Sequence, residues 1–236
     1  AGSFLERRFS FYAAYHQNPV NQAIHICCVP LILATAMVAA NIVLTIPASI
    51  ADVAPNLESY GFPMNPAFVI GIVYAVYYLF LSLKLGVRLV LLDTLLRRPF
   101  LLTLGVNVSQ LGLLPFLAGV ILASNAFTFA FSPSSGLQVA GAIHVIAWML
   151  QFYGHYLHEG GFGLLGSMFE ASTSRCVFVD PGKAPALLDS FFESLAMAPM
   201  FICIEVAFHL GFLRDFKARV DKDVAARHAE AARKGQ

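Results

Sequence analysis

Two long stretches without a charged side chain constrain what this chain can fold into. No Asp, Glu, Lys or Arg occurs in residues 9–51, and none occurs in residues 99–158. A helix that crosses the hydrocarbon core of a bilayer needs about 20 mostly apolar residues, and both stretches exceed that length. Only 12% of the chain is charged, whereas soluble domains have about 25%. The pattern indicates a polytopic helical membrane protein.

The apolar segments predict about four full transmembrane helices. We expect them at about residues 24–47, 67–83, 100–123 and 137–157, with Asn125 and a Ser/Pro/Gly turn separating the last two. A fifth apolar segment, at about 186–212, contains Pro199 and several acidic residues. We expect a broken or re-entrant hairpin there, bent near Pro199, because such backbone is tolerated where protein buries it. The predicted fold class is an all-α transmembrane bundle of about four full spans plus this C-terminal hairpin.

Basic residues predict that both termini face the cytoplasm. Arg7 and Arg8 lie at the N-terminus, whereas the loops at 48–66 and 124–136 contain no Lys or Arg. The hairpin returns the basic, Ala-rich, helix-forming residues 214–236 to the same side. We therefore expect a single transmembrane domain over residues 1–213, which would hold any catalytic site, and a charged cytoplasmic tail over 214–236.

A cluster of amides and imidazoles stands at the start of the first apolar segment, in "YHQNPVNQAIH". Asn18 and Pro19 are typical of a helix start, with Asn as the N-cap and Pro at the first helical position. His16 then lies in the turn before the helix, and Asn21 and His25 share one helical face. Capping and hydrogen bonding between helices are one interpretation of this cluster, and a functional site is the other.

Two further polar clusters lie inside apolar segments. Residues spaced by 7, 4 and 3 form one stripe on a helix, namely His144, Gln151, His155 and His158. Glu205 and His209 are four residues apart in the fifth segment, where an internal ion pair would also account for them.

Ionisable side chains are costly inside a membrane, so these clusters indicate a function. Imidazoles with few carboxylates and no thiolate pattern suit iron, zinc or copper. The chain has no H-H pair, which excludes the histidine-box desaturases and hydroxylases. It also has no H-E-x-x-H, G-x-S-x-G, P-loop or dinucleotide fingerprint.

Three motifs resemble those of the yeast-type 2-hydroxy fatty acid dioxygenase family. They are "FYAAYHQNPVNQAIHICCVP", "WMLQFYGHYLHE" and "APALLDSFFESLAMAPMFICIEVAFHLGF", and they follow the order found in that family. One departure is the insertion at about residues 160–183, which separates the second motif from the third and would affect the choice of substrate.

The resemblance implies an integral enzyme of the endoplasmic reticulum membrane. Such an enzyme uses Fe(II) and O₂ to shorten a long-chain 2-hydroxy fatty acid by one carbon, as in phytosphingosine degradation, and no nucleic acid takes part. It implies that His16, His25 and His155 bind the metal and that Glu159 belongs to the catalytic set. His144 and His158 lie outside the family pattern, but their spacing on the same helical stripe makes either one a candidate for a fourth metal ligand. The polar positions expected to support these residues are Asn18, Asn21, Gln151, Asp189 and Glu205.

Two other functions remain open from the sequence. One is a different metal-dependent membrane enzyme that acts on another lipid or a terpenoid-like substrate, and product analysis would separate it from the first. The other is a lipid-binding membrane protein without catalytic activity, which predicts no bound metal and no effect of histidine substitutions.

Overall fold

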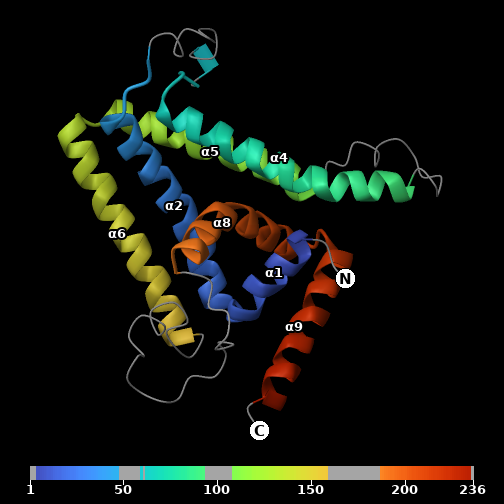
Figure 1. Cartoon of the computed structure of the whole chain (residues 1–236). Coiled ribbons are helices and arrows are strands. Elements are labelled where there is room, and N and C mark those ends of the chain that lie inside the picture. Colours follow the sequence, from blue (N-terminus) through green and yellow to red (C-terminus); the bar gives the residue numbers. More distant parts are fainter. Residues whose placement is uncertain (1–3, 48–58, 61, 94–107, 159–186, 235–236) are drawn as a thin grey trace. The chain divides into compact units, whose positions relative to one another are not determined.

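The structure is a computed structural model that describes residues 4–47, 59–60, 62–93, 108–158 and 187–234 (Figure 1). Within these ranges the chain forms helices joined by turns and contains no strand, which confirms the predicted all-α class. The helices are α1 (Phe4–Tyr15), α2 (Pro19–Val43), α4 (Pro66–Asp93), α5 (Val108–Ala130), α6 (Pro133–His158), α8 (Leu187–His209) and α9 (Arg214–Lys234).

Several helices are long and apolar enough to cross a membrane. Within the described ranges they are α2, the Gly112–Ala130 part of α5 and the Pro133–Leu157 part of α6. The bent pair Leu195–His209 and Arg214–Glu230, from α8 and α9, makes a fourth if the pair counts as one span. The apolar part of α4, Pro66–Leu81, is shorter than these spans. Large apolar side chains on α6, such as Val145, Ile146 and Met149, are more than half exposed, as expected for contact with lipid.

The chain divides into two compact units, which are Ala1–Ile26 with Leu150–Gln236, and Cys27–Met149. In the second unit α4 packs against α5. At Gly71 of α4 an added Cβ would clash with the side chain of Ile121 in α5, so glycine permits the close approach of these helices. The buried side chains of this unit include Met37, Val38, Tyr78, Leu113 and Leu117.

Asparagine side chains join α2, α4 and α5 inside the second unit. Asn41 and Asn65 each donate through Nδ2 to Oδ1 of Asn125, at 3.2 and 2.8 Å. At the start of α4, Oδ1 of Asn41 accepts the backbone N–H of Ala67, and Oδ1 of Asn65 accepts that of Phe68. Asn125 was expected at a turn between two spans, but α5 continues beyond it to Ala130, because this buried amide is satisfied by side chains within the helix bundle.

The first unit is built around Phe9 of α1, which is 1% exposed. Its ring contacts the rings of Phe201 and Phe208 in α8 and of Phe216 in α9, at centroid distances of 5.4, 5.5 and 5.9 Å. Buried Val220 extends this contact along α9. The predicted helix in residues 214–236 is therefore present, and it packs against α1.

The predicted bend in the C-terminal segment is present, but it lies at a different position from the one expected. Helix α8 continues through Pro199, and the sharp bend of 111° lies between His209 and Arg214. There the N–H of Phe212 donates to the carbonyl of Ala207, and the N–H of Gly211 donates to that of Phe208, in the pattern of a Schellman motif. Gly211 has a φ of 79°, a value that glycine adopts without strain, so the helix ends there.

Candidate metal centre

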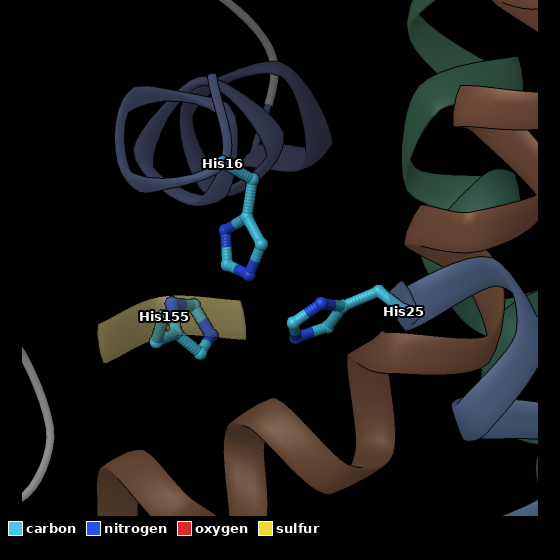
Figure 2. Close-up of side chains that lie close together, drawn as sticks. All are labelled: His16, His25 and His155. Carbon is cyan, nitrogen blue, oxygen red and sulfur yellow. The ribbon is translucent and has the colours of Figure 1, made fainter. Parts of the chain in front are cut away.

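Three imidazoles from separate parts of the chain converge in the first unit (Figure 2). His16 lies in the turn between α1 and α2, His25 lies in the second turn of α2, and His155 lies in the last turn of α6. One ligand atom from each ring lies within 4.8 Å of the others. The ring centroids are 4.7 to 4.9 Å apart, and the rings stand nearly perpendicular to one another. This arrangement directs nitrogen atoms from three sides toward one common point.

Hydrogen bonds set the tautomers of two of these rings. Nδ1 of His16 donates to the carbonyl oxygen of Tyr12 at 2.9 Å, and Nδ1 of His25 donates to that of Asn21 at 3.0 Å. With the proton on Nδ1, Nε2 carries the lone pair that a metal requires. Donation of the second ring N–H to a carbonyl is also the usual way in which metal-binding histidines are oriented.

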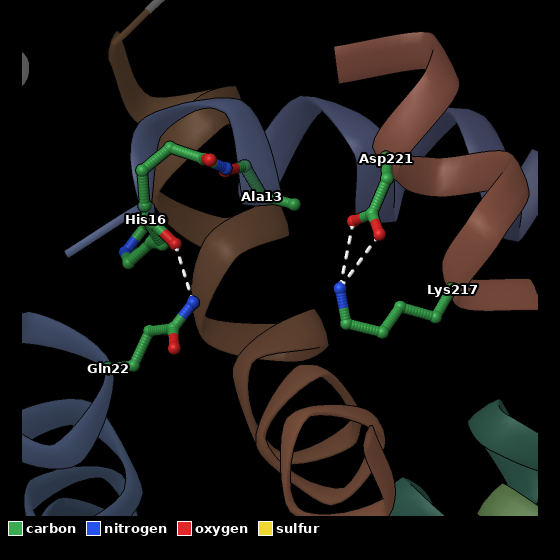
Figure 3. Close-up of polar contacts among 6 residues, drawn as sticks. Ala13, His16, Gln22, Lys217 and Asp221 are labelled. Atoms are coloured by element: carbon green, nitrogen blue, oxygen red, sulfur yellow. Dashed lines mark hydrogen bonds and ion pairs between the residues drawn. The ribbon is translucent and has the colours of Figure 1, made fainter. Parts of the chain in front are cut away.

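The turn that carries His16 is fixed by its own sequence. Asn18 caps α2 as predicted, since its Oδ1 accepts the N–H of Val20 at 2.8 Å. Nε2 of Gln22, in the first turn of α2, donates to the carbonyl oxygen of His16 at 2.8 Å (Figure 3). On the other side, the N–H of His16 donates to the carbonyl of Ala13. These bonds hold the His16 backbone between two helices.

An aromatic contact links the centre to α8. The ring of Tyr12 stacks on the imidazole of His16, with centroids 3.8 Å apart and an interplanar angle of 20°. Tyr12 also contacts the ring of Phe201, and its side chain interacts with the carboxyl group of Glu205, which is 4% exposed. The fifth apolar segment thus supports the centre through Tyr12, whereas His209 of the same helix is exposed.

The position of His155 depends on the glycine before it. A Cβ added at Gly154 would clash with Oδ1 of Asn21 and would lie 3.1 Å from Cδ1 of Ile24. Glycine at this position therefore permits the close approach of the end of α6 to the start of α2. This close approach brings His155 of one helix beside His25 of the other.

The chemistry of the donor atoms fits a transition metal. His16 and His25 are 8% and 7% exposed. Burial, reinforced by the neighbouring imidazoles of His25 and His155, holds the pKa of His16 well below its ordinary value of 6.5. The ring is therefore neutral at neutral pH, as a metal ligand must be. Three imidazoles leave coordination positions open for other molecules, and they suit iron, zinc or copper.

His144, predicted as a candidate fourth ligand, has a different environment. Its Nε2 accepts the indole N–H of Trp148 at 3.1 Å, and its Nδ1 lies 2.8 Å from Oγ1 of Thr35. The Thr35 hydroxyl donates to the carbonyl of Leu31, so it accepts from His144. Both ring nitrogens are thus occupied, which argues against a ligand role for His144.

The remaining predicted residues divide into two groups. Asn21, Gln151 and Glu205 are buried in the same unit as the three histidines. Glu159 lies outside the described residues, as do the side chains of His158 and Asp189. Sequence reasoning assigned no role to Tyr12 or Gln22, although both lie in the first motif. The signal for them was their spacing, since Tyr12 is four residues before His16 and Gln22 is six residues after it.

Known proteins resemble the chain over most of its length. The family described as "2-hydroxy-palmitic acid dioxygenase Mpo1-like" matches residues 3–161, a range that contains all three clustered histidines. The yeast protein "2-hydroxy-palmitic acid dioxygenase MPO1" from Saccharomyces cerevisiae is 26% identical over 220 residues, which cover 93% of this chain and 89% of the yeast protein. No solved structure matches the chain.

Proposed function

Since the chain belongs to the 2-hydroxy-palmitic acid dioxygenase Mpo1-like family, we propose that it oxidises long-chain 2-hydroxy fatty acids with O₂ to the acid one carbon shorter. The convergence of His16, His25 and His155 is the observation that carries this proposal. The name of the yeast relative, a 2-hydroxy-palmitic acid dioxygenase, supports the same reaction. In the cell the reaction would serve the degradation of phytosphingosine.

The metal in this proposal is Fe(II), held by Nε2 of His16, by Nε2 of His25 and by His155. When bound, iron supplies the means to bind O₂ and to hold a 2-hydroxy acid through its hydroxyl and carboxylate oxygens. The chain's residues orient the donors, because the Tyr12 and Asn21 carbonyls fix two rings through Nδ1. The stacked ring of Tyr12 covers one face of His16 and keeps water from it.

The proposed reaction balances without a co-reductant. R–CHOH–COOH and O₂ give R–COOH, CO₂ and H₂O, in which the bond between C1 and C2 breaks and C1 leaves as CO₂. The substrate loses four electrons in all, and reduction of O₂ to the oxidation level of water takes up four. The enzyme therefore needs no second organic substrate such as an oxo acid.

We place this enzyme in the membrane of the endoplasmic reticulum, with both termini in the cytoplasm. The three histidines lie before α2, near its start, and near the end of α6, which puts the centre near one end of two candidate spans. In that position the polar head of a fatty acid reaches the metal while its chain stays among apolar side chains. The basic residues at both ends of the chain favour the cytoplasmic side.

Product analysis tests the proposal directly. Iron-loaded protein in lipid nanodiscs, given 2-hydroxypalmitic acid and O₂, should yield pentadecanoic acid, detected by gas chromatography with mass spectrometry. His25→Ala and His155→Ala should lose the bound metal together with the product, whereas His228→Ala, an exposed position on α9, should keep both. Full turnover in metal-free protein would refute the proposal, and so would an iron-loaded protein that shortens no 2-hydroxy acid.

A further inference from the structure

A buried amide beside the metal centre has a donor that no group in the described part of the chain accepts. Gln151 is 7% exposed, and its Nε2 has no hydrogen-bond partner among the described residues. Leaving a buried donor unsatisfied is costly, and such groups in native structures usually serve a ligand, an ion or a water molecule. The position of Gln151 indicates which of these the amide serves.

Gln151 lies one helical turn before His155 in α6, and residues four apart on a helix share a face. The same side of α6 meets α2, since Gly154 lies against Asn21. Gln151 is farther from the end of α6 than these residues, so it lies on the side of His155 that leads toward the middle of the candidate span. If the chain of a bound fatty acid extends into the membrane, its carboxyl group would lie between this amide and the imidazoles.

The carboxylate of such a substrate has few other donors available. None of the buried polar side chains in the described residues is a Lys or an Arg. The Nδ1 donors of His16 and His25 are already given to backbone carbonyls. A carboxylate has two oxygens and about four lone-pair positions, so a metal that takes one oxygen leaves others to be satisfied.

We propose that Nε2 of Gln151 donates a hydrogen bond to the carboxylate of the bound 2-hydroxy fatty acid. This inference rests on the proposed function and adds a substrate-binding residue to it. The bond selects the free acid over its ester, because a hydrogen bond to an ionised acceptor is about twice as strong as one to a neutral acceptor. It also fixes the carboxyl end of the acid beside the three histidines.

Equilibrium binding without O₂ tests this role apart from catalysis. Metal-loaded protein in nanodiscs is dialysed against 2-hydroxypalmitic acid and, separately, against its methyl ester, with empty nanodiscs as the blank. Gln151→Met keeps about the length of the side chain and removes the donor, and Gln151→Leu removes the donor with a side chain of different shape and volume. Gln138→Met is the matched control, because Gln138 is an exposed residue of the same helix.

We expect both Gln151 variants to bind the acid about 10- to 100-fold more weakly, which is the loss typical of one hydrogen bond to a charged group. Binding of the ester should change much less, the metal content should stay at the wild-type level, and Gln138→Met should bind the acid like the wild type. Unchanged affinity for the acid in either folded Gln151 variant overturns the inference. Loss of metal from both variants also overturns it, since Gln151 would then support His155 and not the substrate.

The wild-type protein separates this inference from the function on which it rests. Wild-type protein that binds metal but no 2-hydroxypalmitic acid refutes the proposed function and the inference together. Wild-type protein that binds and shortens the acid, with Gln151 variants that bind it equally well, refutes the role of Gln151 alone.

Discussion

Replacing Gly154 by alanine should damage the metal centre although Gly154 is not a ligand. The added Cβ would clash with Oδ1 of Asn21, a side chain with no exposed surface. It would also lie 3.1 Å from Cδ1 of Ile24, which is tighter than an ordinary van der Waals contact. Asn21 is fully buried, so relief of these contacts displaces either its side chain, at the start of α2, or the end of α6 that carries His155.

The size of the effect follows from the tolerance of metal coordination. Ordinary contact with a Cβ begins at 3.4 Å, whereas metal–ligand distances are met within about 0.2 Å. The contact with Ile24 is shorter than an ordinary contact by more than that tolerance, and the contact with Asn21 is shorter still. Overpacking of this kind costs about 1–3 kcal/mol. If the strain falls on the bond between His155 and the metal, the affinity for the metal drops by about 10- to 100-fold.

The assay is a competition between the protein and a chelator of known affinity, carried out without O₂. Gly141→Ala is the matched control, because Gly141 lies in the same helix and its added Cβ would meet nothing within 4 Å. We expect Gly141→Ala to bind metal like the wild type and to melt no earlier, since alanine favours a helix over glycine.

Wild-type metal affinity in folded Gly154→Ala would refute the reasoning. In that case either the end of α6 does not need to approach α2 so closely, or His155 does not hold the metal. The metal content of His155→Ala decides between these two explanations, because the protein loses most of its bound metal only when a true ligand is removed.

Four further predictions follow from the contacts. Gln22→Leu removes the hydrogen bond to the His16 carbonyl and should weaken metal binding by up to about tenfold. Gln138→Leu, at an exposed position on α6, should not weaken it, and equal effects of the two variants would contradict the role of Gln22. His144→Ala should keep the bound metal while lowering the melting temperature, because both ring nitrogens of His144 are engaged by Thr35 and Trp148, and metal loss would restore it as a ligand. Gly211→Ala should cost about 1 kcal/mol of unfolding free energy in denaturant titrations, since its φ is positive, and an unchanged midpoint would show that the bend tolerates a side chain. In sealed vesicles, protease added outside should cleave the residues after Arg214, and their protection would place the C-terminus on the far side.

Local sequence rules predicted the start of α2 and the turn before it, which carries His16. The pair Asn18-Pro19 predicted where α2 begins, and the structure places the cap and the first turn there. The three histidines of the resemblance also meet, because the turn before α2 and the end of α6 carry them to one place. The start of α2 follows from short-range chemistry that the sequence displays directly, whereas the meeting of the three histidines was expected from the family resemblance alone.

Other features depend on packing, which spacing alone does not reveal. His144 shares a helical face with His155 but lies several turns earlier in α6. Its ring nitrogens bond to Trp148 and Thr35. The bend was expected at Pro199, but a proline inside a membrane helix can be accommodated by its neighbours, whereas a left-handed glycine ends the helix.

The packing of α9 was open to prediction from its pattern. Phe216, Val220 and Val224 follow one another at intervals of four residues, which is the spacing of an apolar helical stripe. The segment is highly charged overall, yet the two valines of this stripe are buried in the structure. Amphipathic spacing is therefore a better guide to docking than overall charge in a segment of this kind.

Metal analysis of the intact protein tests the central claim most directly. Protein purified without O₂ should contain about one iron per chain, as three converging imidazoles predict, and His155→Ala should contain almost none. Active protein that holds no metal would contradict the account. Zinc in place of iron, in protein that remains active, would contradict the oxidation and favour a hydrolytic reaction at the same three histidines.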